Sequence, residues 1–116
     1  MMAYAQQNTT VQDTTKPVGY QFTDIKRLPA TSVKDQYRAG TCWSWSTSSF
    51  LESEMMRMGK DSVNLSAMYF VKHAYSDKAD KYVRLHGVLN FAVGGASSDV
   101  TNMAKKYGIV PLEVYQ

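Results

Sequence analysis

The chain has 116 residues and a formal net charge of +3, from 13 Lys and Arg against 10 Asp and Glu. This length fits one domain, and the scattered basic residues form no stripe that would follow a nucleic-acid backbone. No apolar run approaches the roughly 18 residues of a membrane-spanning helix, and a lone cysteine excludes a disulfide within the chain. We therefore expect neither a nucleic-acid partner nor a membrane partner.

Residues 1–19 are predicted to be a flexible leader before a folded part at 20–116, because they are rich in Gln and Thr and poor in large apolar side chains. Within the leader, Ala3-Tyr4-Ala5 has the small-x-small form of a signal-peptide cleavage site, although no apolar segment precedes it. Two interpretations stay open: a disordered leader, or the remnant of a signal peptide. The second predicts a secreted or periplasmic protein, and the first leaves a cytoplasmic one.

The folded part is expected to begin with an extended segment, from Tyr20 to Val33, because Pro29 bars a helix there. A helix is then predicted from Cys42, with Thr41 as its N-cap and Gly59 as its C-terminal stop. The side chains predicted to share one face of this helix recur at three- and four-residue steps: Trp43, Ser46, Thr47, Phe50, Leu51, Met55 and Met58.

A second and a third helix are predicted further along the chain. The second starts at Ser66, and the side chains placed along it are Tyr69, Phe70, His73 and Ala74. The segment GVLNFAVGGASS is too short and too rich in glycine for a helix, so it is expected to be a loop crossing. The third helix starts at about Ser98 and is closed by Gly108 before Pro111, with one face formed by Val100, Met103, Ala104 and Tyr107.

Cys42 is the first candidate for chemistry. A lone cysteine is by default a buried packing residue, because free cysteine is among the most buried residue types. However, the first turn of a helix carries the positive end of the helix macrodipole, which favours a thiolate. Gly40 would also let a substrate backbone approach closely. From its position alone, Cys42 can be either a core residue or a nucleophile.

Gln36 is the second candidate, and it lies six residues before Cys42 in a loop that must curl back to the helix. Its neutral amide could donate a hydrogen bond to an oxyanion, together with the backbone N–H of Cys42. Without the cysteine, Gln36 would be interpreted as a solvated loop residue. The nucleophile hypothesis predicts that Cys42 begins the longest helix and that the Gln36 side chain faces its sulfur.

The segment VKDQYRAGTCWSWS resembles the active-site segment of papain-like cysteine peptidases, where Gln, Cys and Trp recur at this spacing. Downstream, LSAMYFVKHAYSDKADKY, the Gly-Gly pair and KKYGIVPLEVY are most similar to the bleomycin hydrolase/aminopeptidase C branch. The similarity runs roughly from Leu28 to Tyr115. It implies that Cys42 is the nucleophile and that Gln36 belongs to the oxyanion hole. The substrate-binding residues that it implies are Gly40, Trp43, Gly94 and Gly95.

Two departures from the family pattern limit what the resemblance implies. Ala39 stands where the secreted papains carry a second cysteine, which favours the bleomycin hydrolase-like branch. The family's catalytic histidine lies well over ~100 residues after the cysteine, so His73 and His86 come too early. His73 is instead expected to pack along its helix, and His86 to lie in a solvated loop. Taken without the resemblance, the Gly-Gly pair could also be an ordinary flexible turn.

The expected fold is therefore mainly α, the helical half of a papain-like α+β cysteine peptidase with its β-rich half absent. The predicted function is peptide hydrolysis through a thioester, with aminopeptidase action implied by the branch, and without a cofactor or metal. The isolated chain is expected to be an N-terminal fragment, inactive without the half that bears His and Asn.

Two other functions stay open: a papain-like module that binds peptides without catalysis, and a small helical interaction domain with a chance motif. The expected partners are a peptide substrate and the β-rich half, and self-association into a homo-oligomer stays open. If the chain stands alone, apolar side chains of the first helix should be exposed, and such a patch would promote association.

Overall fold

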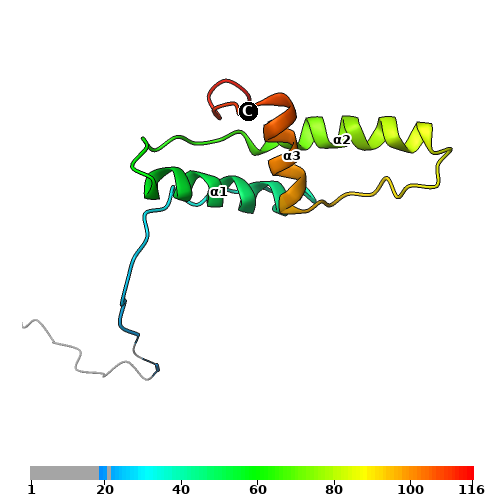
Figure 1. Ribbon diagram of the computed structural model, residues 1–116. Coiled ribbons are helices and arrows are strands. Elements are labelled where there is room, and N and C mark those ends of the chain that lie inside the picture. The colour runs from blue at the N-terminus through cyan, green and yellow to red at the C-terminus, as the bar shows by residue number, and fades with distance from the viewer. Residues whose placement is uncertain (1–18, 21) are drawn as a thin grey trace, which may run out of the picture.

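The computed structural model describes residues 19–20 and 22–116, in which three helices form the folded part (Figure 1). They are α1 (Cys42–Arg57), α2 (Ala67–Arg84) and α3 (Ser97–Tyr107). Within the described residues the only β pairing is an isolated antiparallel bridge between Leu65 and Pro111. The predicted mainly α fold is confirmed. The predicted leader, apart from Gly19, and its cleavage-like Ala3-Tyr4-Ala5 lie outside the described residues.

The ends of α1 were predicted correctly, although its N-terminal cap works differently. Thr41 is the N-cap, but its hydroxyl makes no capping hydrogen bond and instead accepts from the indole Nε1 of Trp45 at 3.1 Å. Gly59 follows the last turn with a φ of 76° and donates to the carbonyl of Met56 at 3.0 Å. Cys42 does begin α1, but α1 has 16 residues and α2 has 18, so the expectation that Cys42 begins the longest helix was wrong.

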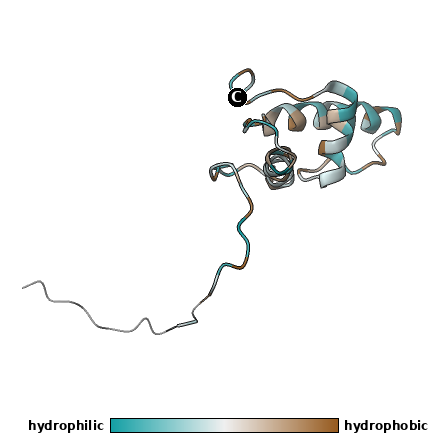
Figure 2. Ribbon diagram, turned by 60° about the vertical axis from the view of Figure 1, so that its left-hand side comes forward, coloured by the Kyte–Doolittle hydropathy of each residue, from teal (hydrophilic) through white to brown (hydrophobic). Residues whose placement is uncertain are grey.

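The face of α1 that packs inward differs from the predicted one. Of the predicted face, Trp43 and Thr47 are buried, whereas Ser46 is exposed and Phe50 and Met58 are each 61% exposed. The other residues buried on α1 are Ser44, Ser48 and Glu52. Figure 2, in which α1 is seen nearly end-on, shows pale colours of intermediate hydropathy along much of this helix. Apolar periodicity was therefore misleading, because small and acidic groups occupy most of the inner face.

The other two helices match their predictions closely. Ser66 caps α2, and its hydroxyl accepts a hydrogen bond from the backbone N–H of Tyr69 at 3.1 Å. The glycine-rich segment from Gly87 to Ala96 is a loop, and α3 follows it. Gly108 ends α3 with a φ of 86°. None of the helices within the described part is both long and apolar enough to cross a bilayer.

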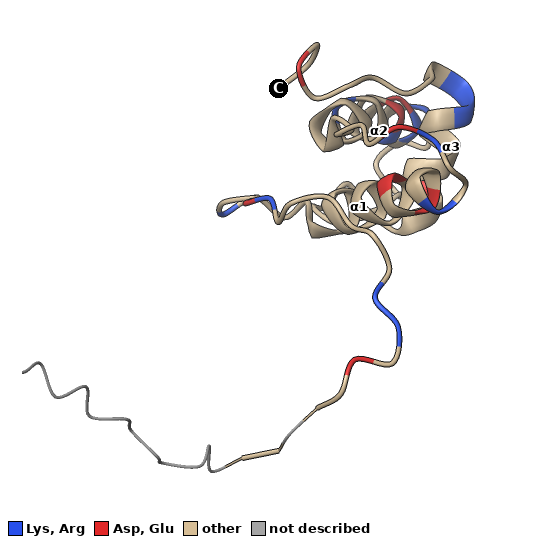
Figure 3. Cartoon of the chain, turned by 90° about the vertical axis from the view of Figure 1, so that its left-hand side faces the viewer, with Lys and Arg blue, Asp and Glu red and all other residues tan. Residues whose placement is uncertain are grey.

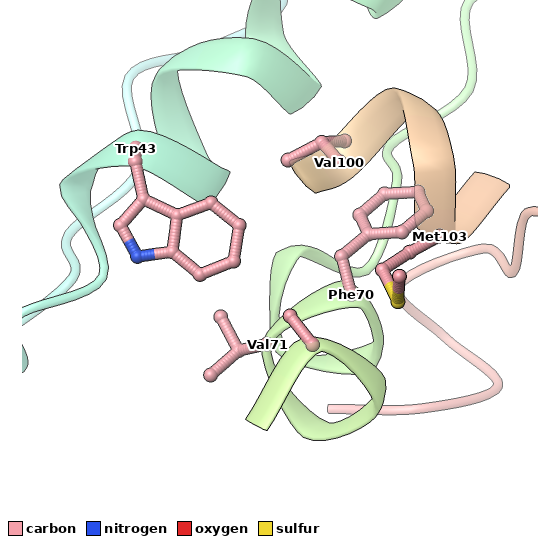
Figure 4. Packing of buried hydrophobic residues seen from close by; sticks show 6 residues of the cluster. Trp43, Phe70, Val71, Val100 and Met103 are labelled. Carbon is pink, nitrogen blue, oxygen red and sulfur yellow. The ribbon is translucent and has the colours of Figure 1, made fainter. Parts of the chain in front are cut away.

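The hydrophobic core lies where the three helices meet, and each helix contacts the other two. Figure 4 shows Trp43 of α1 turned toward Phe70 and Val71 of α2 and toward Val100 and Met103 of α3. Ala74 completes this buried cluster. The core is small, and it places the start of α1 against the first half of α2 and against α3.

A buried carboxylate binds the extended segment that precedes the Gln36 turn, residues 22–35, which is called the lead-in below. Glu52 is 1% exposed and accepts hydrogen bonds from the Thr31 hydroxyl at 2.5 Å and from the Leu65 backbone N–H at 2.6 Å. It also pairs with the Lys34 ammonium, which comes from the same lead-in. Figure 3 shows that basic and acidic residues are spread over the lead-in and all three helices. The segment just before Gln36 is therefore held against α1.

Candidate active site

Cys42 lies at the surface, at the first position of α1, and its side chain is exposed. The backbone N–H groups of the first helical turn have no acceptor within the helix. They carry the positive end of the macrodipole, which stabilises negative charge placed beside them. The exposed sulfur is therefore accessible to a substrate, and the sealed core position that would have contradicted the nucleophile hypothesis is not observed.

Gln36 lies in a tight turn just before α1. The side chain of Asp35 accepts a hydrogen bond from the Tyr37 N–H at 2.8 Å, and Tyr37 has a φ of 53°, so the chain reverses here. The Gln36 side chain is half-buried, and its Nε2 donates to the Ala39 carbonyl at 3.2 Å. An amide has two N–H donors, so one remains for another acceptor. That this donor faces the Cys42 sulfur stays a prediction.

The glycine-rich loop reaches the segment around Cys42. A Cβ placed on Gly40 would lie 3.2 Å from the Cβ of Val93. A Cβ placed on Gly95 would lie 2.7 Å from the Trp43 indole and 2.9 Å from the Asp99 carboxylate, so only glycine fits there. The glycine-rich loop thus contacts Gly40, two residues before Cys42, and Trp43, which directly follows it. Contact of Gly40 and Gly95 with a substrate is not tested by this geometry.

Trp43 has a different place from the other predicted binding residues. Its side chain is 7% exposed and belongs to the core, where its ring meets Tyr75 edge-on with centroids 6.5 Å apart. Its indole Nε1 is buried and has no hydrogen-bond partner among the described residues. Trp43 is therefore a core residue that lies against Gly95 of the loop.

The two histidines lie where the sequence predicted. His73 stacks on Tyr107 with ring centroids 4.1 Å apart and meets Tyr69 edge-on at 4.5 Å, so its predicted packing role is confirmed. His86 is exposed in the turn that follows α2 and has a φ of 52°. Within the described residues, no group of three or more His, Cys, Asp or Glu side chains could hold a metal ion.

Sequence reasoning missed two residues that shape this site. Glu52 was part of no motif, and a carboxylate inside a helix is ordinarily read as a solvent-facing group. Lys78 falls in the charged segment SDKADKY, which is typical of a solvated helix face, yet its ammonium donates to the Gly94 carbonyl at 2.5 Å. No local pattern separates these two residues from their exposed neighbours.

Comparison with known proteins adds one finding. A family model described as papain family cysteine protease matches residues 17–112, which include the Gln36 turn, Cys42 and the glycine-rich loop. Among curated proteins, no match was found.

Proposed function

Because the chain belongs to the papain family of cysteine proteases, we propose that Cys42 is the nucleophile of a peptidase. Its thiolate attacks a peptide carbonyl, the tetrahedral intermediate expels the amine, and the resulting thioester is hydrolysed by water. The observation that carries this proposal is the exposed Cys42 at the first position of α1, six residues after Gln36 in the turn that precedes the helix. A buried structural cysteine would need none of these surroundings.

Gln36 and the Cys42 backbone N–H are proposed to stabilise the oxyanion. The Cys42 N–H belongs to the first turn of α1, which has no intrahelical acceptor. Gln36 is fixed by the turn and by the lead-in that Glu52 holds, so its amide can meet developing charge with little reorganisation. Two donors aimed at one oxygen are the usual means of stabilising such an intermediate.

The general base is proposed to come from polypeptide outside the present sequence. A thiol protease needs a histidine to take the thiol proton and to protonate the leaving amine. His73 is occupied by the rings of Tyr69 and Tyr107, and His86 lies in the turn beyond α2. The family resemblance implies that a β-rich half supplies the His and its Asn partner, so we infer that the isolated chain does not turn over peptides.

Aminopeptidase action is the finer part of the proposal, and it rests on the resemblance to the bleomycin hydrolase/aminopeptidase C branch. Removal of single N-terminal residues would require a group that blocks one end of the cleft. The segments KKYGIVPLEVY and the Gly-Gly pair support the branch, and the family match is to the papain family as a whole.

The test compares the isolated chain with the chain combined with the β-rich half of its own protein. The isolated chain should release no dye from an aminoacyl-amide substrate, and its Cys42 should react slowly with iodoacetamide at neutral pH. Both reactions should increase when the second half is added, and Cys42→Ala should abolish them. In the combined enzyme, Gln36→Ala should lower kcat about 10²–10³-fold.

Two results would contradict the proposal. Hydrolysis by the isolated chain, lost in Cys42→Ala, would show that the base lies within these residues. Peptide binding by the combined halves without any hydrolysis would indicate a binding module in place of a peptidase.

A further inference from the structure

A surface groove adjoins the turn that carries Gln36, and it is called the Gln36 groove below. Its volume is about 510 Å³, which is within the range of clefts that hold small ligands. The walls come from the Gln36 turn, from α1, from α2 and from the C-terminal segment. Most of the lining side chains are apolar, and these are Tyr37, Ala39, Trp45, Met68 and Leu112.

The Gln36 groove is continuous with the candidate active site. Gln36, the proposed oxyanion donor, is itself part of the wall. On the α1 side, the indole Nε1 of Trp45 donates to the hydroxyl of Thr41 at 3.1 Å, and Thr41 directly precedes Cys42. A peptide whose carbonyl oxygen meets the Gln36 amide would therefore bring a side chain next to that carbonyl to the groove.

Tyr37 differs from the other lining residues in its backbone. Its φ of 53° lies in the left-handed region, where the Cβ of any residue except glycine comes too close to the following carbonyl oxygen. The hydrogen bond from the Tyr37 N–H to the Asp35 side chain holds this conformation. Glycine would adopt it without strain, so the turn alone gives no reason for a tyrosine.

The Tyr37 ring also contributes little to the packing of the chain, because Tyr37 is 85% exposed. Neither the turn nor the core therefore explains an aromatic side chain at this place. Tyrosine is enriched where proteins contact other molecules, and strained backbone is concentrated at ligand sites. The ring lies at the edge of an apolar groove that reaches the proposed oxyanion donor, so a bound molecule is the contact that it fits.

We propose that Tyr37 is a specificity-determining residue, whose ring, together with Trp45 and Met68, binds a large apolar side chain that flanks the scissile bond. The preferred substrates are therefore peptides with a residue such as Leu or Phe beside the bond that is cut. This inference rests on the proposed function and deepens it, because it names a substrate preference of the same site. A large apolar side chain gains from leaving water in the groove, whereas glycine at that place gains nothing.

The first measurement uses the chain combined with the β-rich half of its own protein, and pairs of peptides that compete for it. One series compares Gly with Leu at the residue before the scissile bond, and a second series compares them at the residue after it. One of the two series should show a preference for Leu of about tenfold in kcat/KM, which partial burial of one leucine side chain supplies. The series that shows it identifies which half of the substrate lies in the Gln36 groove.

Three variants assign the preference to the Tyr37 ring. Tyr37→Gly removes the ring but suits the φ of 53°, so the melting temperature should be kept. Its preference for Leu over Gly should fall about tenfold, whereas Tyr37→Phe should keep the preference because the ring remains. Tyr20→Gly is the matched control, because Tyr20 is 92% exposed but lies at the start of the described chain, outside the groove.

The second measurement needs no turnover, because the combined halves carry Cys42→Ala. The NMR signals of the Tyr37 ring are assigned from their absence in Tyr37→Gly. They should shift when trileucine amide is added and stay unchanged with triglycine amide. Tyr37→Gly should also weaken the binding of trileucine amide more than that of triglycine amide.

Three results would overturn the inference. The first is hydrolysis in which neither series prefers Leu, and the second is an equal loss for Leu and Gly peptides in Tyr37→Gly. The third is a Tyr37 ring whose signals shift when the β-rich half is added but not when trileucine amide follows, because the second half would then occupy the groove. Failure of the peptidase proposal would instead appear as absent hydrolysis of every peptide with Cys42 intact, and the binding of trileucine amide would still decide whether the groove takes an apolar side chain.

Discussion

The inner faces of α1 and α3 bury different kinds of side chain. On α3 the buried residues are Val100 and Met103, which contribute to the core by contact alone. On α1 only Trp43 is a large buried apolar residue, and the remaining inward positions are small hydroxyls and a carboxylate. An apolar face is stabilised by removal from water, whereas a polar face is stable only when its groups find partners.

The hydrogen-bond partners of the buried polar side chains on α1 determine which segments pack against this helix. Ser44 donates to the Ala67 carbonyl at 2.8 Å and so ties α1 to the first turn of α2. Glu52 binds Thr31, Lys34 and Leu65, which come from the segments on either side of the helix. The polar face therefore specifies which segments lie against α1, and these include the segment that leads to Gln36. Apolar contacts such as those of Val100 specify less, because they have no direction.

The strongest way to break the polar face is Glu52→Ala. The change leaves the buried Leu65 N–H and the Thr31 hydroxyl without their acceptor and Lys34 without its partner, so the free energy of unfolding should fall by about 3 kcal/mol. Urea unfolding measures this loss. Glu54→Ala is the matched control on the same helix, since Glu54 pairs with Arg57 at the surface and should change little. An equal effect of both substitutions would contradict the importance of the buried carboxylate.

The next change tests the contact between Trp43, the large buried apolar residue of α1, and the glycine-rich loop. In Gly95→Ala the new methyl group would meet the Trp43 ring at 2.7 Å, so the loop must move, and stability should fall by about 2 kcal/mol. Binding of peptides to the loop should weaken as well. Gly19→Ala provides the control, because no described residue lies within 4 Å of a Cβ built there. Thermal unfolding of the two variants should differ clearly, and equal melting temperatures would show that the close contact does not matter.

A pair of serines sharpens the comparison between partnered and unpartnered polar groups. Both are buried on α1, but the Ser48 hydroxyl has no hydrogen-bond partner among the described residues, whereas that of Ser44 donates to Ala67. Ser44→Ala should cost about 1 kcal/mol, and Ser48→Ala should be neutral or stabilising. Chemical denaturation of the two variants measures the difference. If Ser48→Ala were the more damaging, burial alone would outweigh hydrogen bonding on this face.

The smallest effect is expected at the surface, where Asp77 of α2 meets α3. Hydrogen bonds from Lys106, at 2.9 Å, and from the Tyr107 hydroxyl, at 2.8 Å, lower the pKa of Asp77 below its usual range. Because the pKa is lowered by folding, this contact stabilises above the unfolded pKa of about 3.9 and is lost as the pH falls through the folded value. Asp77→Asn should therefore reduce the melting temperature slightly at pH 7 and hardly at all near pH 2. A larger difference in acid would contradict this sign.

Much of the fold could be read from local sequence. The starts of the three helices, the cap at Ser66 and the glycine ends at Gly59 and Gly108 follow from hydrogen bonds that close within a few residues. The packing of His73 followed from the period of α2. The inward face of α1 was predicted wrongly, because Phe50 is large and apolar and fits the helical spacing, yet it is exposed.

For the candidate site, too, some features could be predicted from local sequence and others could not. The sequence by itself determined that Cys42 begins a helix, that Gln36 precedes it in a turn and that a glycine-rich loop follows α2. Only the tertiary structure decided that Gly95 lies on Trp43, that Lys78 donates to Gly94 and that Glu52 binds the lead-in. The physical reason is separation along the chain. A helix closes its bonds between a residue and its fourth neighbour, whereas the partner of Lys78 lies 16 residues away and those of Glu52 lie 13–21 residues away. Such partners meet only when the helices pack.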